Sequence, residues 1–393
     1  MSDDAAGDAQ QIVLSVRREC NELKRWFLRD ACPVWWELGS DRVHGGFHER
    51  LTPEGEPTHE PRRARLHPRQ ICAFRVADEL GWNGPVEDAI RHALNYFLFH
   101  YQRPDGFYRA AVSPNGAVTD DSALLYDQAF ALLGFAAAFD VLDDDPIRDK
   151  ALRLLGVMNR RLKRPGGGFE EDESQQAHLT SNSNMHLLEA ALAWMELDAD
   201  DRWRELAAEI VELSLRHFRH DGAGPIREFF ASDWTPAPGV VGSIVEPGHQ
   251  FEWAWLLSRW GEVAGDPTAF TAARALLDDA ESNGVDRARN VAINALLDDG
   301  SIRDSDARLW PQTERLRAAC MAAETTGLTY YWEMTLAAAK SLGGYLQTPL
   351  RGLWHDVMTS DGKYPEQAAP ASSFYHIAGA IAALDQTLHR LRA

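Results

Sequence analysis

Apolar residues recur with helical spacing along most of the chain. Leu125, Ala129 and Leu132 lie three or four positions apart, which places them on one side of a helix. The same spacing predicts mostly apolar helices over residues 123–142, 185–197, 249–263 and 375–391. More charged helices, apolar on one side only, are predicted between them over residues 85–100, 146–162, 201–217 and 267–283. This alternation indicates an inner helical layer covered by an outer, half-exposed layer.

A polar residue recurs near the start of successive apolar stretches, each time just after a loop rich in Gly, Pro, Asp or Ser. The interval is about 60 residues, which is too long for one helix and right for two helices with their connections. The recurring residues are Arg69, Tyr126, His186, His249, Glu314 and His376. Repeated hairpins bring the same structural position to one place, so this spacing predicts a single polar site at one rim of a six-unit helical ring.

The loops repeat as well, because a glycine followed by an aromatic residue recurs at Gly46-Phe47, Gly106-Phe107 and Gly168-Phe169. Glycine permits the tight reversal, and the aromatic ring closes the end of a helix pair. No convincing strand pattern is present, so strands are expected only as short hairpins in these loops. We predict one all-α domain over residues 1–393, an (α/α)6 barrel, with residues 1–12 as a flexible acidic N-terminus. An open solenoid has the same period, so closure of the ring is an inference.

The composition narrows the class of function. A net charge of −19 argues against nucleic acid and anionic membranes as partners, and it disfavours an anionic substrate unless a local basic pocket overrides it. The four cysteines lack metal-type spacing and are expected to be reduced thiols. The acidic N-terminus is unlike a secretory signal, and no apolar run approaches the ~18 residues of a membrane helix. We therefore expect a cytoplasmic protein.

His249 is the first candidate for chemistry. Pro247 and Gly248 form a turn before an apolar helix, so His249 is expected in its first turn, with Glu252 one turn further along the same face. A helix N-terminus disfavours the imidazolium ion, and the ring is therefore expected to be neutral. The alternative is a capping histidine that packs on Trp253.

His376 and His186 occupy equivalent positions in other repeats. Ser372 or Ser373 is a plausible N-cap of the helix that carries His376, and capping is again the alternative to chemistry. Asn182 lies four positions before His186, so the two side chains share a helix face and form a hydrogen-bonding surface suited to sugar hydroxyls. An ordinary N-cap is the alternative for Asn182. Three imidazoles that converge on one rim favour chemistry over packing.

The remaining candidates are polar and aromatic side chains of the same stretches. A guanidinium at Arg69 needs an anion or an oxygen-rich ligand, and an ion pair with Glu252 or Glu314 is the structural alternative. The phenol of Tyr126 is suited to a sugar oxygen. Trp310 and Trp354 have rings that stack well on sugars, although Trp is more often simply buried. The sequence contains no phosphate-binding glycine loop and no dinucleotide fingerprint, so no nucleotide cofactor is expected.

Four segments together resemble the N-acylglucosamine 2-epimerase superfamily, which includes N-acylglucosamine and cellobiose 2-epimerases and mannose or related aldose–ketose isomerases. They are YDQAF at 126–130, NSNMHLLEA at 182–190, EPGHQFEWAW at 246–255 and FYH at 374–376. The resemblance extends from about Trp35 to Leu391, and the third segment looks most like the mannose isomerase branch. It implies an (α/α)6 barrel that acts on unmodified reducing sugars, with no metal and no other cofactor, as a monomer or homodimer.

The resemblance also implies roles for single residues. The paired catalytic histidines of the family match His249 and His376, and the substrate-binding arginine matches Arg69, with Arg65 as a near alternative. The substrate-binding tyrosine, asparagine and third histidine match Tyr126, Asn182 and His186, and Glu252 matches a carboxylate that orients substrate hydroxyls. Ser183-Asn184 is a departure, because epimerases often have Pro-His there.

These observations lead to the hypothesis of an isomerase that interconverts D-mannose and D-fructose through a cis-enediol, with His249 and His376 as the acid/base pair. A sugar 2-epimerase begins with the same proton abstraction and is the first alternative. A glycoside hydrolase on the same barrel and a non-catalytic helical scaffold are more distant alternatives. The histidine that takes the C2 proton, and whether the sugar is phosphorylated or a disaccharide, stay open.

Overall fold

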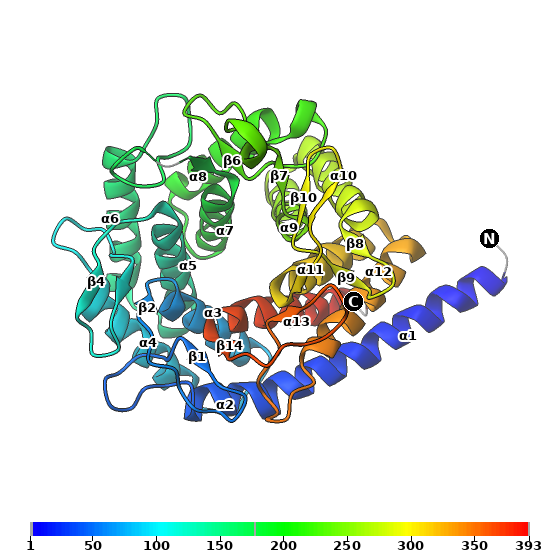
Figure 1. Cartoon of the computed structure of the whole chain (residues 1–393), viewed down its shortest axis with the longest axis horizontal. Helices are drawn as coiled ribbons and strands as arrows, with labels where there is room; N and C mark the ends of the chain where they lie inside the picture. The colour runs from blue at the N-terminus through cyan, green and yellow to red at the C-terminus, as the bar shows by residue number, and fades with distance from the viewer. Residues whose placement is uncertain (1–2, 177, 392–393) are drawn as a thin grey trace.

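Six inner helices form the wall of a closed ring. The computed structural model describes residues 3–176 and 178–391. Within these residues the inner helices are α3 (Leu66–Glu79), α5 (Leu125–Leu142), α7 (Ser181–Leu197), α9 (Pro247–Ala264), α11 (Leu309–Thr326) and α13 (Phe374–Arg390). Each packs against the next, and α13 packs against α3 (Figure 1). The ring is therefore closed, which confirms the (α/α)6 barrel.

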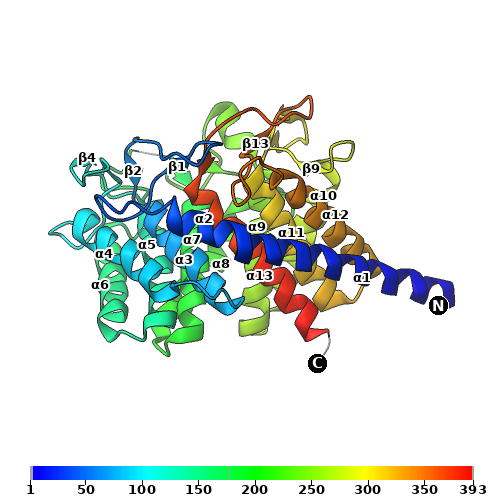
Figure 2. The ribbon, with the colours of Figure 1, turned by 90° about the horizontal axis from the view of Figure 1, so that it is seen from below.

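An outer layer covers this ring. It consists of α1 (Asp3–Trp26), α4 (Val86–Tyr101), α6 (Asp145–Arg161), α8 (Asp201–Leu213), α10 (Pro267–Asn283) and α12 (Thr329–Tyr345), with the short α2 (Cys32–Glu37) after α1. Helix α1 packs against α12 and α13 and runs across the outside of the ring (Figure 2). The flexible N-terminus expected over residues 1–12 belongs to α1 from Asp3 onwards, and residues 1–2 lie outside the described part of the chain.

The predicted helices agree with the observed ones to within a few residues at most ends. The segment predicted as 201–217 is divided, because α8 ends at Leu213 and a π-helical turn follows over Ser214–Phe218. A second π-helical turn, Phe27–Ala31, joins α1 to α2, and short 3-10 turns cover His220–Gly222, Gly239–Ser243 and Ala371–Ser373.

Helix α5 corrects one expectation. It is long and apolar enough to cross a membrane by length and composition, so the statement that no apolar run approaches that length was wrong. Of its 18 residues, 72% are buried inside the barrel, where α5 packs between α3, α6 and α7. The apolar length of α5 is therefore explained by its place in the core.

Short antiparallel strands link the loops at one rim (Figure 2). They are β1 (Arg50–Leu51), β2 (Arg62–Arg63), β3 (Ala111–Val112), β4 (Val118–Asp120), β5 (Leu179–Thr180), β6 (Phe229–Phe230), β7 (Ile244–Val245), β8 (Val285–Asp286), β9 (Val291–Ala292), β10 (Ala295–Leu297), β11 (Ile302–Asp304), β12 (Ala307–Arg308), β13 (Val357–Met358) and β14 (Ala369–Pro370). The expectation of local hairpins holds for β3–β4, β8–β9 and β10–β11. The pairs β1–β14, β2–β3, β5–β6, β7–β10 and β12–β13 instead join loops of different repeats. Each loop is therefore held by its neighbour around the rim.

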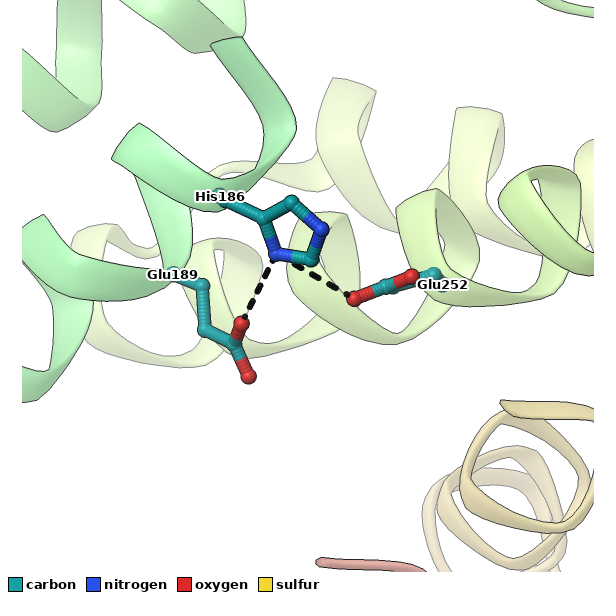
Figure 3. A group of neighbouring side chains, drawn as sticks. All are labelled: His186, Glu189 and Glu252. Carbon is teal, nitrogen blue, oxygen red and sulfur yellow. Dashed lines mark hydrogen bonds and ion pairs between the residues drawn. The ribbon is translucent and has the colours of Figure 1, made fainter. Parts of the chain in front are cut away.

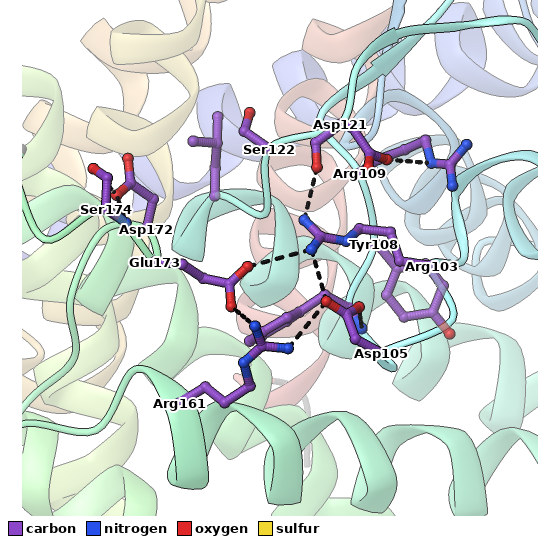
Figure 4. A network of polar contacts seen from close by, with 12 residues as sticks. Arg103, Asp105, Tyr108, Arg109, Asp121, Ser122, Arg161, Asp172, Glu173 and Ser174 are labelled. Atoms are coloured by element: carbon purple, nitrogen blue, oxygen red, sulfur yellow. Dashed lines mark hydrogen bonds and ion pairs between the residues drawn. The ribbon is translucent and has the colours of Figure 1, made fainter.

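The rim loops are also connected by charged side chains. Arg103 contacts Asp105 at 2.7 Å and Glu173 at 3.3 Å, and Arg161 at the end of α6 contacts the same two carboxylates (Figure 4). We call these four residues the rim network. Nearby, Phe107 is fully buried after Gly106, whose φ of 96° needs glycine, so the aromatic residue closes the helix pair as predicted. The four cysteines are free and buried.

Candidate active site

The inner helices bring the six recurring polar residues together. Arg69 donates to the hydroxyl of Tyr126 at 2.7 Å, and the Tyr126 ring lies 5.1 Å from that of His186. His186 is 3.7 Å from Glu252, and potential ligand atoms of Glu252, Glu314 and His376 all lie within 4.8 Å of one another. His249 is connected to His376 through Trp310, whose ring lies 4.9 Å from His249 and 5.8 Å from His376. One site near the rim therefore contains all six, as the spacing predicted.

His376, at the start of α13, is held by a carboxyl group. Its Nδ1 lies 2.8 Å from Oε1 of Glu314, which leaves Nε2 for a ligand. Burial, reinforced by the positive charge of Arg69, lowers the pKa of His376 well below its usual range, and burial raises the pKa of Glu314. His376 is therefore neutral at ordinary pH. Ser373 is the N-cap residue of α13, as the sequence suggested, but its side chain makes no capping hydrogen bond.

His249, in the first turn of α9, has the opposite charge state. Its Nδ1 lies 2.9 Å from Oε2 of Glu228 and 3.6 Å from Oε2 of Glu246. Burial opposes the charged ring, but these two carboxylates outweigh it and raise the pKa of His249 to about 10. The expectation of a neutral His249 was therefore wrong. The effect of the helix N-terminus is small compared with that of two carboxylates in contact with a buried ring.

Trp310, at the start of α11, lies against both imidazoles. Gly248 makes room for it, because a Cβ at that position would lie 2.5 Å from the Trp310 ring. Gly248 is therefore required because α9 packs closely against Trp310 at this position. It lies within α9 and does not form the turn that the sequence suggested. Trp354 is the predicted residue that the structure does not bring to the site. Its ring is 1% exposed and stacks on Trp35 at 4.8 Å and on Phe374 at 5.9 Å, so it is not available to a sugar.

A second carboxylate cluster lies behind His186 (Figure 3). Nδ1 of His186 lies 3.2 Å from Oε2 of Glu189 and 3.7 Å from Oε1 of Glu252. Among the described residues, neither oxygen of Glu252 has a hydrogen-bond partner, although the residue is 1% exposed. Burial, together with the charges of Glu314 and Glu189, raises the pKa of Glu252 well above its usual range.

Three residues of the site were missed from the sequence. Arg317 contacts Glu314 at 2.9 Å and Glu189 at 3.3 Å, and its position one turn after Glu314 on α11 was a usable signal. The hydroxyl of Tyr375 donates to Glu189. Both residues lie in segments already noted for their resemblance. Glu228 gave no signal, because it lies in an irregular loop before β6, outside the helical repeat.

Arg69 does not form the ion pair that was its alternative explanation. Its guanidinium donates to Tyr126 and to the backbone oxygen of Ser372. The nearby Arg65 instead contacts Asp127 at 3.1 Å, which leaves Arg69 as the arginine next to His376 and His186. Within the described residues, Nε of Arg69 is buried without a hydrogen-bond partner.

Asn182 is not the cap of α7, because Thr180 occupies that position and accepts from the backbone nitrogen of Ser183. Asn182 instead lines a pocket of about 350 Å³. The other lining residues are Arg65, Tyr126, Glu171, Thr180, Ser183, Glu228, Phe229, Glu246 and His249. Burial raises the pKa of Glu171 to about 7. Carboxyl groups thus outnumber guanidinium groups in this pocket, in keeping with the acidic chain.

Two groups of side chains have spacings compatible with a metal ion. They are His186, Glu189 and Glu252, and Glu252, Glu314 and His376, and they share Glu252. The other chemistry that the site offers is a neutral imidazole and a charged one that lie against the same indole, with a guanidinium nearby. Such a pair can remove a proton from carbon and stabilise the oxyanion that results.

Known proteins that are similar to this chain are named as sugar isomerases and epimerases. The family model of N-acylglucosamine 2-epimerase (GlcNAc 2-epimerase) matches residues 45–380. The chain is 43% identical over 385 residues to a mannose-6-phosphate isomerase of Rhizobium meliloti, with 96% of this chain and 100% of the relative covered. It is 21% identical over 363 residues to a D-mannose isomerase of Marinomonas mediterranea, covering 88% and 92% of the two chains. Among solved structures, cellobiose 2-epimerase of Spirochaeta thermophila has the same fold, with a TM-score of 0.85, 21% identity and coverage of 96% and 98%.

Proposed function

The chain belongs to the N-acylglucosamine 2-epimerase family, a group of sugar isomerases and epimerases, and from this premise we propose that it interconverts D-mannose and D-fructose. The glycoside hydrolase and scaffold hypotheses are set aside by this membership. The single observation that carries the proposal is the pair of buried histidines that lie against Trp310, where His376 contacts Glu314 and His249 contacts the carboxylates of Glu228 and Glu246. These surroundings lower the pKa of His376 and raise that of His249. Two titratable groups whose pKa values are driven apart form a natural base and acid.

His376 is the proposed base. An open-chain aldose carries at C2 a proton that is acidified by the neighbouring C1 carbonyl, and a neutral imidazole is able to accept it. Glu314 fixes the ring through Nδ1, so Nε2 receives the proton. General base catalysis of this kind contributes about 10²–10⁴-fold.

His249 and Arg69 are the proposed partners of the developing oxyanion. Enzymes reach rate enhancements of about 10⁶-fold or more, so the base alone is insufficient. A charged imidazole and a guanidinium, buried and already in place, stabilise the enediolate oxygens without reorganising, and each such donor contributes about 10²–10³-fold. Glu228 holds His249 in the charged form for this task.

The same charge states favour isomerisation over 2-epimerisation. Isomerisation needs His376 to return the proton to C1 on the face from which it was taken, while His249 gives its proton to O1 and takes the proton of O2, which restores its charge. Two-base epimerisation instead needs His249 to donate to carbon from the opposite face. An acid with a pKa of about 10 donates weakly to carbon near neutrality but strongly to an oxyanion through a hydrogen bond.

The choice between a free and a phosphorylated sugar is the finer part of the proposal. The acidic pocket lined by Glu171, Glu228 and Glu246 disfavours a phosphate dianion, which supports free D-mannose as the substrate. The similarity to the mannose-6-phosphate isomerase of Rhizobium meliloti makes mannose 6-phosphate the second candidate.

Proton NMR in D2O tests both the proposed reaction and the proposed substrate. The purified protein, without added metal or nucleotide, is incubated separately with D-mannose, mannose 6-phosphate and cellobiose. We expect fructose from mannose, at a higher kcat/KM than for the phosphate ester. Glucose as the only product from mannose would replace the isomerase with an epimerase, and a preference for the ester would favour the second candidate.

A further inference from the structure

We propose that His186, Glu189 and Glu252 bind one divalent transition-metal ion, with Zn²⁺ as the probe, and that this ion inhibits the enzyme. The binding site follows from the structure alone. The inhibition rests on the proposed function, because it assumes that Glu252 and His186 contact the sugar. The ion is a regulator here and takes no part in the proton transfers described above.

The spacing of the three donors is that of a coordination sphere. Ligands about 2.1 Å from a metal ion, at a tetrahedral or octahedral angle, lie roughly 3.0–3.4 Å from each other. Nδ1 of His186 lies 3.2 Å from Oε2 of Glu189 and 3.7 Å from Oε1 of Glu252, and all three atoms lie within 4.8 Å of one another. The first distance fits this spacing but is also that of a hydrogen bond, and the second is longer than both. The ring of His186 and the two carboxylates therefore lie close enough for small side-chain movements to place them around one ion (Figure 3).

Glu252 supplies an independent reason for a cation. Its carboxyl group is 1% exposed, and neither of its oxygens has a hydrogen-bond partner among the residues that the structure describes. Buried carboxyl groups are normally paired or bound to a metal. A nitrogen donor from imidazole with two carboxylate oxygens suits Zn²⁺ and related first-row ions better than Mg²⁺ or Ca²⁺, which prefer oxygen donors alone.

The overlapping group of Glu252, Glu314 and His376 is less suitable. Nδ1 of His376 and Oε1 of Glu314 are 2.8 Å apart, which is a hydrogen bond with no room for an ion between the two atoms. Oε1 of Glu314 also accepts from Thr313, and its Oε2 accepts from Arg317. The oxygens of Glu189 also have partners, because Oε2 accepts from Tyr375 and Oε1 accepts from Arg317. The position around His186 is preferred because its nitrogen and oxygen donors are further apart, at 3.2 Å.

An approach to this position is present on the side of the barrel away from the sugar pocket. Glu189 lines a cavity of about 350 Å³ between the later halves of the inner helices. The other charged residues that line the same cavity are Asp140, Glu196, Glu262, Glu324, Arg75, Arg259, Arg317 and Arg390. An ion that enters there reaches Glu189 without crossing the pocket that contains His249.

Direct binding is the decisive measurement. Chelator-treated protein is titrated with Zn²⁺ by calorimetry, for the wild type, His186→Gln and His376→Gln, with thermal unfolding to verify that each variant is folded. We expect one ion per chain in the wild type and in His376→Gln, and binding weakened by about 100-fold or more in His186→Gln. Absence of binding in the wild type, equal affinity in His186→Gln, or loss in His376→Gln alone would overturn the site.

Inhibition is measured separately on the wild type with saturating and limiting sugar. We expect Zn²⁺ to raise the apparent KM and chelator to restore it, because the ion and the sugar share Glu252. Zn²⁺ that binds in the calorimeter without altering turnover would disprove the inhibitory role. Because calorimetry needs no turnover, an inactive protein that still binds Zn²⁺ at His186 would contradict the proposed function and leave the metal site intact.

Discussion

The rim network and the centre of the barrel use the same types of charged residue in opposite ways. At the rim, two arginines and two carboxylates contact each other in a ring, so every charge faces one of opposite sign (Figure 4). At the centre, Arg317 contacts Glu189 and Glu314, whereas the nearby Glu252 has no hydrogen-bond partner among the described residues. Figure 3 shows Glu189 and Glu252 on either side of His186.

Solvent makes this difference important. The rim residues are partly exposed, and pairs of that kind contribute about 0–1 kcal/mol each. The central residues are buried, where an uncompensated polar group is expensive because no water replaces the missing partner. A fold that retains such groups keeps them for a ligand. Complete pairing therefore marks a part of the scaffold, and incomplete pairing in the interior marks the candidate site.

The largest effect is expected at His376. Replacement by Gln removes the proposed base and should lower kcat by about 10²–10⁴-fold with little change in stability. His389→Gln is the matched control, because it lies on the same helix and is bonded to the backbone of Asp385. Steady-state turnover of D-mannose checks both variants, and equal kcat values in the two would contradict the role of His376.

Glu252 and Glu281 sharpen the comparison, because both are buried glutamates. Glu281 is fully paired with Arg315 through two contacts of 2.7 Å, so Glu281→Gln should destabilise the fold by about 3–5 kcal/mol without altering activity per folded molecule. Glu252→Gln should instead lower activity by about 100-fold, since a misplaced substrate is enough for that loss. Its stability should equal or exceed that of the wild type.

The pH dependence of stability extends this test. Because the pKa of Glu252 is raised in the folded protein, its contribution to stability is greatest at low pH and is lost as the pH rises through that pKa. The advantage of Glu252→Gln over the wild type should therefore grow with pH. Urea unfolding at several pH values measures it, and an advantage that shrinks with pH would be inconsistent with a buried carboxyl of raised pKa.

Glu228 determines the charge of His249. The pKa of His249 is about 10, so the alkaline limb of the pH–rate profile for kcat/KM should lie near that value. Glu228→Gln removes a carboxylate that supports the charged ring and should move this limb to lower pH. The stability that the charged His249 provides is complete below its unfolded pKa of 6.5 and is lost as the pH rises towards 10. An unmoved limb in Glu228→Gln would refute the assignment.

The smallest effect is expected at the rim. Arg161→Ala removes two contacts of the rim network and should change the free energy of unfolding by about 1 kcal/mol or less, with a difference that decreases at high salt. Activity should not change. Denaturation at low and high ionic strength checks this, and a large loss of activity would show that the rim network belongs to the site.

The sequence was sufficient to predict the barrel and the convergence of its polar residues, because both depend on a helical period that survives local variation. It was not sufficient for the charge of His249, because Glu228 reaches His249 through the irregular loop before α9, in which the backbone nitrogen of Glu228 donates to the backbone oxygen of Ile244. The expected stacking role of Trp354 failed for a related reason. The sequence does not show whether a tryptophan ring lies against imidazoles, as Trp310 does, or stacks on another aromatic ring in the core, as Trp354 does on Trp35.

The loss of deuterium from C2 of D-mannose labelled at that carbon tests the division of labour between the two histidines most directly. Proton NMR follows the label in the wild type, His249→Gln and His376→Gln. We expect rapid loss in the wild type, slow but measurable loss in His249→Gln, and none above the uncatalysed background in His376→Gln. Loss from His376→Gln as fast as from the wild type, or faster than from His249→Gln, would show that His376 is not the base.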